Sequence, residues 1–372
     1  MKGILLLLWC LLLMTACGNK EKESAEAIIK DEQDCMIQGE TDMSAFIEVK
    51  KIIPLETSDV SLIGSVEKII KRNGVIYVKS RNRPLLSFDE NGKFLNAIGA
   101  VGIGPHQYVQ IADFDVKGDY VYVLTSNKIQ AYTRSGKWEK TIPLTLNASN
   151  MRIAGDEILL FVLGDKHVIH VIDMDGREKA STLEGNQALR LNRAIAFIPY
   201  GENILFPMGR SNQLLAYNIK RQEFSMMKYL MSGSLTNKRE AELMEETPHY
   251  DRRLRQIGCF DGLFTDKTHV IVPCIEEDDI ALWIKDLQNS QCQAYQLSKL
   301  KNDITFLSAS SFFYGNTEDD SGFLTYVMPY RLEEGLDKVS GKKKELYFER
   351  MRKVLEPLGD EANPILVEYK IR

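Results

Sequence analysis

The fold is decided by the stretch Ser87-Phe88-Asp89-Glu90-Asn91-Gly92-Lys93, whose pattern returns twice further along the chain. The two returns are Ala131-Tyr132-Thr133-Arg134-Ser135-Gly136-Lys137 and Val171-Ile172-Asp173-Met174-Asp175-Gly176-Arg177. In each copy, an aromatic or branched residue precedes a polar turn that ends in glycine and a basic residue. A strand–turn–strand unit that recurs at about 40 residues is typical of a β-propeller.

Apolar anchor residues at the ends of the expected strands set the number of blades. The anchors are Phe88, Tyr132, Ile172, Tyr217, Ile284 and Tyr369. The first four are separated by 44, 40 and 45 residues, and the next two intervals lengthen to 67 and 85. Both longer intervals hold an insertion of helical pattern, about residues 236–256 and 332–358. The sequence therefore predicts an all-β, six-bladed propeller over residues 44–372 with two helical insertions in its last blades.

The two ends of this region are expected to close the ring. Residues 46–55 precede the first blade, and residues 364–371 form a strongly apolar final strand. Pairing them in one blade would hide two strand edges that otherwise invite aggregation.

The N-terminus carries the pattern of an export signal. Lys2 is followed by the short apolar run 4–13, which is too short to span a bilayer. Met14-Thr15-Ala16-Cys17 resembles the lipoprotein signal, so residues 1–16 are expected to be removed and Cys17 lipidated. No Asp follows Cys17, so we expect an outer-membrane lipoprotein of a Gram-negative bacterium, facing either the periplasm or the outside. The polar segment 17–43 is interpreted as a flexible tether.

Composition excludes nucleic acid as a partner and does not decide whether the cysteines are free thiols or form a disulfide. The chain has 47 basic and 52 acidic residues, a net charge of −5, and no basic patch of the kind that nucleic acid requires. The expected membrane contact is the lipid at Cys17. Cys259, Cys274 and Cys292 fall within one blade. We interpret them as buried free thiols, with a disulfide among them as the alternative.

The stretch 87–108 resembles a signature of NHL-like six-bladed propeller lipoproteins of the Bacteroidota type. It reads Asp89-Glu90-Asn91-Gly92-Lys93-Phe94, then Ile98-Gly99, then Gly102-Ile103-Gly104-Pro105-His106-Gln107-Tyr108. The opening strand at residues 53–57 and the ending at 363–372 are also similar to this family. The resemblance covers about residues 46–372 and implies the fold and an envelope location. It departs at His106-Gln107, where Gly-Glu is usual in the family.

Two short stretches supply the first candidate site residues. The glycine-rich loop 99–108 is expected to cross between blades on glycines of positive φ, and it offers His106, Gln107 and Tyr108 for a surface contact. Asp113 and Asp115 share one face of a strand start, so they could act as an acid–base pair or hold a cation. Capping of the turn before the next strand is the favoured interpretation of these two acids.

A basic and aromatic cluster follows the first helical insertion: His249, Tyr250, Arg252 and Arg253. Arginine and tyrosine at such a site suit an anionic or sugar ligand. A solvated, salt-bridged helix end is an equal alternative.

The residues favour a binding module over an enzyme. No nucleophile elbow and no Cys–His–acid order is present, so no catalytic residues, metal ligands or cofactor are predicted. We expect a non-catalytic envelope lipoprotein that binds a glycan, a peptide or a protein partner. The alternative is a propeller hydrolase or lyase using carboxylates and His106 at the central channel.

Overall fold

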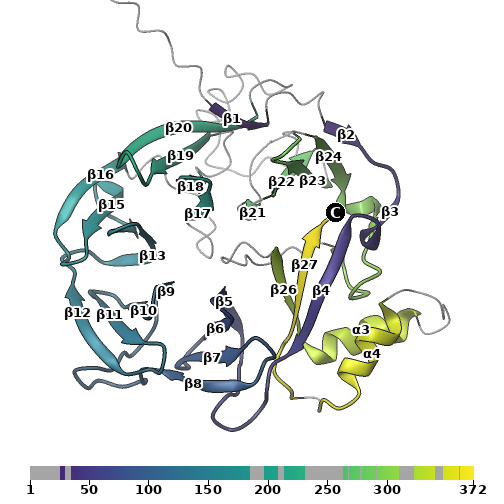
Figure 1. Cartoon of the computed structure of the whole chain (residues 1–372), viewed down its shortest axis with the longest axis horizontal. Helices are drawn as coiled ribbons and strands as arrows, with labels where there is room; N and C mark the ends of the chain where they lie inside the picture. Colours follow the sequence, from purple (N-terminus) through teal and green to yellow (C-terminus); the bar gives the residue numbers. More distant parts are fainter. Residues whose placement is uncertain are drawn as a thin grey trace, which may run out of the picture.

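The computed structural model describes residues 26–29, 35–184, 197–207, 213–230, 263–266, 268–276, 279–289, 291–309, 322–339, 347–359 and 361–372. Within them the chain forms six blades of mainly antiparallel strands around a central axis (Figure 1). The prediction of a six-bladed β-propeller is confirmed. The predicted cluster at 249–253 and the first insertion at 236–256 lie outside the described residues.

Blades one to three are four-stranded sheets built from consecutive strands. Blade one holds β5 (Val66–Arg72), β6 (Val75–Ser80), β7 (Leu85–Asp89) and β8 (Phe94–Ile98). Blade two holds β9 (Asp113–Lys117), β10 (Tyr120–Leu124), β11 (Lys128–Thr133) and β12 (Trp138–Pro143). Blade three holds β13 (Ala148–Ala154), β14 (Glu157–Val162), β15 (His167–Asp173) and β16 (Glu178–Glu184).

Blades four to six each gain a strand from the N-terminal end of the described chain. Blade four holds β17 (Ile198–Tyr200), β18 (Asn203–Pro207), β19 (Gln213–Asn218) and β20 (Glu223–Leu230), with β1 (Glu26–Ile29) outside them. Blade five holds β21 (Phe264–Thr265), β22 (His269–Glu276), β23 (Asp279–Asp286) and β24 (Cys292–Gln296), with β2 (Cys35–Ile37) outside. Blade six holds β26 (Phe323–Val327), β27 (Ile365–Ile371) and β4 (Ile47–Pro54). A short parallel pair joins β3 (Thr41–Asp42) to β25 (Leu300–Lys301), beside the 3₁₀ turns η2 (Met43–Ala45) and η3 (Leu297–Lys299).

All six anchor residues occupy equivalent places in the ring. They lie on β7, β11, β15, β19, β23 and β27, and each side chain is buried. Ring closure is confirmed as well, because β27 pairs antiparallel with β4 from Ile365↔Pro54 to Ile371↔Ile47.

The repeated turn is explained by how blades dock on one another. Gly92 has φ +85, and a Cβ there would lie 2.2 Å from the carbonyl oxygen of Pro54, at the end of the outermost strand of the preceding blade. Gly136 and Gly176 have similar positive φ values and approach the carbonyl oxygens of Ala97 and Pro143 in the same way. Only glycine combines that backbone conformation with such close contact. The turn therefore recurs because each copy packs against its neighbouring blade.

The acid that opens two of these turns organises their backbone. In the third copy, Asp173 Oδ1 accepts hydrogen bonds from the backbone N–H groups of Asp175 and Arg177, each 2.9 Å long. The bond from Arg177 is the main cause that holds the pKa of Asp173 below its ordinary value. Asp89 accepts the equivalent pair from Asn91 and Lys93 in the first copy.

The predicted second insertion is helical, as two helices rather than one. α3 spans Pro329–Val339 and α4 spans Phe348–Leu355, and both lie outside the ring beside blade six (Figure 1). Their buried residues Leu332, Leu336 and Met351 join the core cluster of blade six. No described helix is long and apolar enough to cross a bilayer.

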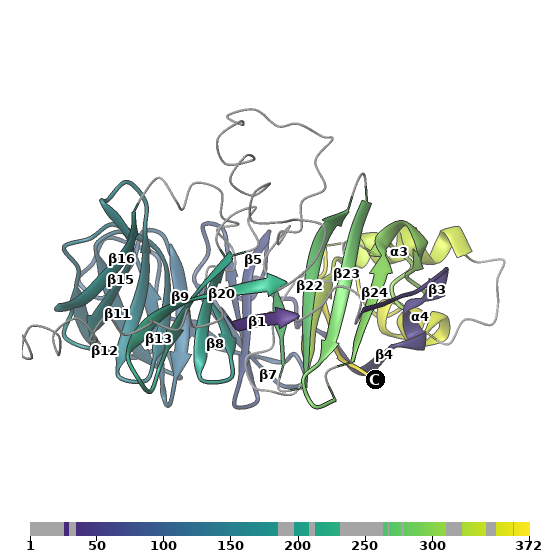
Figure 2. The same ribbon diagram turned by 90° about the horizontal axis from the view of Figure 1, so that it is seen from above.

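The segment expected to be a tether up to residue 43 differs from that expectation. From Glu26 on, it supplies the outermost strands of blades four and five before the chain reaches blade six. We call residues 26–29 and 35–54 the N-terminal belt. Figure 2 looks onto the rim of the ring that carries β1.

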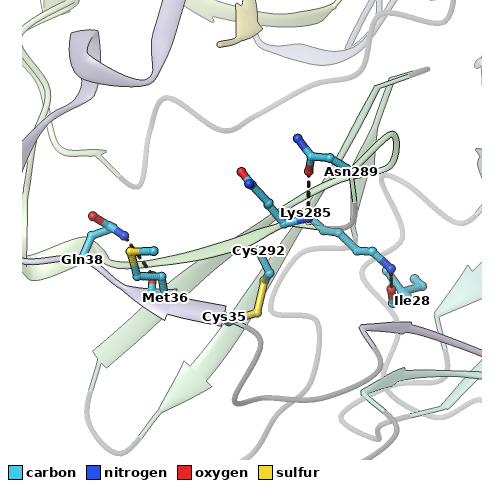
Figure 3. Close-up of a disulfide and its surroundings, with 8 residues drawn as sticks. Ile28, Cys35, Met36, Gln38, Lys285, Asn289 and Cys292 are labelled. Carbon is cyan, nitrogen blue, oxygen red and sulfur yellow. Dashed lines mark hydrogen bonds between the residues drawn. A yellow bond between two sulfur atoms is a disulfide. The ribbon is translucent and has the colours of Figure 1, made fainter.

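A disulfide fastens the belt to blade five. Cys35 and Cys292 are directly paired between the parallel strands β2 and β24, and their sulfur atoms are bonded (Figure 3). The interpretation of Cys292 as a free thiol is therefore wrong. Its partner is Cys35 of the N-terminal belt, not Cys259 or Cys274. Cys274 lies within β22, and Cys259 is outside the described residues.

Candidate functional site

The two predicted carboxylates occupy the innermost strand of blade two. Asp113 and Asp115 alternate with Phe114 along β9, and both are buried. Asp113 Oδ2 accepts the backbone N–H of Met151 at 2.9 Å, and Asp115 Oδ2 accepts that of Ile153 at 2.8 Å. Both acceptor–donor pairs cross from blade two to β13 of blade three. The shared face of the two acids, which the sequence predicted, is thus the face that meets the next blade.

The remaining oxygens of these carboxylates are also engaged. Asp113 Oδ1 accepts the N–H of Phe114 and the ammonium of Lys68, both at 2.8 Å. Asp115 Oδ1 accepts the N–H of Val116 at 2.7 Å. An innermost strand has no further strand on its channel side, so its N–H groups need such partners.

Cationic side chains from blade one bind the carbonyl oxygens of the same strand edge. Lys68 Nζ donates to the carbonyl of Phe114 at 2.9 Å, Arg72 to that of Val116 at 2.8 Å and Lys79 to that of Ala112 at 2.9 Å. The charged groups at this edge therefore bind blade one to blade two and blade two to blade three. They join neighbouring blades rather than meeting as an acid–base pair.

His106 does not join these acids. Its ring stacks on Trp138 with centroids 3.8 Å apart, and Trp138 belongs to β12, the outermost strand of blade two. β9 and β12 are three strand spacings apart, about 14 Å. The carboxylates and His106 are therefore not placed to act on one substrate atom, which requires hydrogen-bond distances.

The loop that holds His106 is a rigid crossover between blades one and two. Gly102 donates its N–H to the carbonyl of Tyr108 at 3.0 Å, and Gly104 donates its own to Gln107 Oε1 at 3.0 Å. Of the three glycines, only Gly99 has a positive φ. Gly102 instead makes room for the Gln107 amide, because a Cβ there would lie 2.1 Å from Gln107 Oε1. The backbone N–H groups that a phosphate cradle would use are thus occupied within the loop.

Tyr108 lies inside the protein rather than at its surface. Its hydroxyl donates to the carbonyl of Ile98 at 2.5 Å and accepts the N–H of Leu85 at 3.0 Å. Burial raises the pKa of Tyr108 to about 12, so the hydroxyl keeps its proton at neutral pH. The side chain packs edge-on against Tyr132 at 6.2 Å and anchors the loop to both blades. Tyr108 is therefore a structural residue, and His106 and Gln107 are the predicted loop residues nearer the surface.

An exposed apolar group at the tip of this loop was missed from the sequence. Ile103 is 96 % exposed, and Val101 and Val109 beside it are exposed as well. Val101 and Tyr108 form a β-bridge that holds the two arms of the loop together. Apolar side chains held out into solvent on a rigid loop are typical of a protein-binding surface. We call Val101, Ile103, Val109 and the His106–Trp138 stack the crossover-loop surface.

The described residues contain no group of three histidine, cysteine or acidic side chains arranged for a metal ion. Among the described residues, the crossover loop exposes apolar and aromatic side chains, whereas the carboxylates between the inner strands are buried.

The fold and these surfaces define a six-bladed propeller with an N-terminal belt. The chain belongs to the family described as Domain of unknown function (DUF4934), whose model matches residues 28–370. The match begins within β1, so the belt is part of the family's domain.

A solved structure with the same fold is described as a "Putative exported protein" from Bacteroides fragilis NCTC 9343. It has 14 % sequence identity and a TM-score of 0.71, and the alignment covers 91 % of this chain and 99 % of that one. BamB from Moraxella catarrhalis aligns over 66 % of each chain at 13 % identity, with a TM-score of only 0.33, which is too low for a structural inference. No curated protein is significantly similar to the sequence.

Proposed function

We propose that the protein is a lipid-anchored protein of the outer membrane whose propeller binds a protein partner through the crossover-loop surface. The signal pattern ending at Cys17 supports export and lipidation. The resemblance of residues 87–108 to NHL-like lipoproteins and the description of the Bacteroides fragilis neighbour as exported support the same location.

The main support for a binding role is the exposed tip of a rigid loop. Ile103 stands almost fully in water while the chain on both sides of it is fixed by Gln107, Tyr108 and the β-bridge. Since little conformational freedom is left to lose, a partner could cover these side chains at a low entropic cost. A hydrolase or lyase is less well supported, because Asp113 and Asp115 are engaged between blades.

Substitution on the loop tests the binding role. The full-length protein with Ile103→Asp is compared with the unmodified protein by quantitative co-purification from its native membrane in mild detergent. We expect partner recovery to fall at least about tenfold, the effect of losing roughly 1.4 kcal/mol or more of binding free energy. Val60→Asp is the matched control, because Val60 is a β-branched apolar residue that is also exposed, on another loop. Equal recovery with Ile103→Asp and with the unmodified protein would reject this surface.

The anchor is tested separately. The mass of the mature N-terminal peptide is expected to show a lipid adduct at Cys17, and Cys17→Ala is expected to move the protein out of the membrane fraction. An unmodified N-terminal peptide from membrane-purified protein would reject lipidation.

A further inference from the structure

The N-terminal belt fixes the point where the chain leaves the propeller. Glu26 pairs with Met227 at the outer edge of blade four, and the following residues continue in register to Ile29↔Leu230. Lys285 of blade five donates a hydrogen bond to the carbonyl of Ile28, and the Cys35–Cys292 disulfide holds the belt on blade five (Figure 3). The exit point is therefore a defined place on the rim of the ring, not the end of a long tether.

The length of chain before that point limits how the ring can stand on a membrane. Cys17 precedes Glu26 by nine residues, and a fully extended chain of that length spans at most about 30 Å. A globular chain of this size has a radius of gyration of roughly 20 Å. The rim at blades four and five therefore lies near any lipid on Cys17, and the far rim can be farther away.

The same rim exposes apolar side chains. Met36 and Ile37 on β2 are 67 % and 73 % exposed, and Met226 on β20 beside β1 is exposed too. β2 is the outermost described strand of its blade, so these side chains have no neighbouring sheet to cover them. Exposed edge strands normally carry charged side chains. β2 carries none, because it consists of Cys35, Met36 and Ile37. Apolar side chains are stabilised at the boundary between headgroups and acyl chains.

We propose that the rim formed by β1, β2 and β20 lies on the phospholipid bilayer, with Met36, Ile37 and Met226 in contact with the lipid boundary. This inference rests on the proposed lipidation of Cys17. The ring then stands on its edge on the membrane. β8, which precedes the crossover loop, and β12, whose Trp138 stacks on His106, lie across the ring from β1 and β2 (Figure 1). The proposed orientation therefore holds these two strands on the side of the ring away from the lipid.

Site-specific fluorescence tests this orientation. Tryptophan is introduced as Met36→Trp or Ile37→Trp in the full-length, membrane-extracted protein. Each variant is reconstituted into vesicles of phosphatidylethanolamine and phosphatidylglycerol, with or without dibrominated phosphatidylcholine, whose bromine atoms quench tryptophan. The emission of the unmodified protein, from Trp138 and Trp283, is subtracted. Ile103→Trp is the matched control, an exposed apolar position in the loop between β8 and β9.

The expected result is that Met36→Trp and Ile37→Trp lose at least about half of their added emission, while Ile103→Trp keeps its own, because the apolar side chains of an interfacial segment reach about 5–10 Å into the boundary. Equal quenching at Ile103→Trp would mean that the ring lies flat and would overturn the inference. Absence of quenching at both rim positions would also overturn it.

The mass of the N-terminal peptide from the same preparation separates the two proposals. A lipidated Cys17 without rim quenching rejects the orientation alone. An unmodified Cys17 rejects the proposed anchor and the orientation together. Thermal melting by circular dichroism confirms that each tryptophan variant is folded.

Discussion

Asp113 and Asp115 show how single residues hold this ring together. Their carboxylates connect the inner strands of two blades through backbone N–H groups, a role that the spacing of two acids did not distinguish from a catalytic pair. The sequence predicted that the two side chains share a face, because alternation along a strand is local. It did not predict which blade that face meets, because the donors at Met151 and Ile153 lie 38 residues further on.

The first residue-scale prediction concerns Asp113→Asn. The amide replaces one acceptor oxygen by a donor, so it loses the ion pair with Lys68 and part of the contact with β13. We expect the free energy of unfolding to fall by about 2–4 kcal/mol, measured by urea denaturation, since a buried ion pair loses one partner. Asp119→Asn serves as the control, because Asp119 is an exposed carboxylate in the same blade. Equal stability of the two variants would contradict the structural role.

A second residue-scale prediction concerns the repeated glycine. Gly136→Ala places a Cβ 2.3 Å from the carbonyl oxygen of Ala97 at a φ of +81°. Gly118→Ala meets a similar positive φ with nothing within 4 Å. We expect Gly118→Ala to cost about 1 kcal/mol for the backbone conformation alone, and Gly136→Ala at least about 2 kcal/mol more, because blade one must move. Urea denaturation of both variants measures the difference. Similar costs would show that the turn does not dock on blade one.

At the scale of elements, the strands of the N-terminal belt were not predictable from the sequence. Residues 26–37 are polar enough to look like a tether, and their few apolar residues do not form an alternating strand pattern. β1 and β2 are strands because β20 and β24 offer them edges, and those edges are formed about 200 and 257 residues later, by Met227 and Cys292. The helices α3 and α4 were predictable, in contrast, because their apolar residues recur at helical spacing within one short segment.

The element-scale prediction tests the disulfide. Cys292→Ser is expected to lower the free energy of unfolding by about 2–5 kcal/mol, the range for loss of a native disulfide that closes a long loop. Cleavage by protease between β2 and Phe46 should accelerate, since β2 then stays on β24 through only a short parallel ladder. The unmodified protein under reducing conditions is the matched comparison. Unchanged stability together with unchanged cleavage would mean that β2 holds its place without the bond.

The whole molecule was the most predictable level, because a repeated unit has few ways to bury its strands. The six anchors are spread over 282 residues from Phe88 to Tyr369, yet each lies on the equivalent strand of its blade. The pattern fixes such positions since every blade must present one apolar face to each neighbour. The surface chemistry follows no repeat. Ile103, Met36 and Ile37 belong to no repeated pattern, and only the assembled ring defines what surrounds them.

The closing prediction at this scale concerns the strand that completes the ring. Deletion of residues 360–372 removes β27, which pairs with β26 on one side and β4 on the other. Ile365, Leu366, Val367 and Tyr369 are fully buried on it, and burial of four such side chains contributes roughly 6–12 kcal/mol. That loss equals the total stability of a typical domain, about 5–15 kcal/mol. We expect no cooperative melting transition by circular dichroism and an earlier elution on size exclusion, because the unfolded chain is more expanded. Deletion of Arg372 alone, an exposed terminal residue that gives up one backbone hydrogen bond to Phe46, should keep a cooperative transition. A truncated protein that melts like the full chain would show that the remaining blades hold the ring without β27.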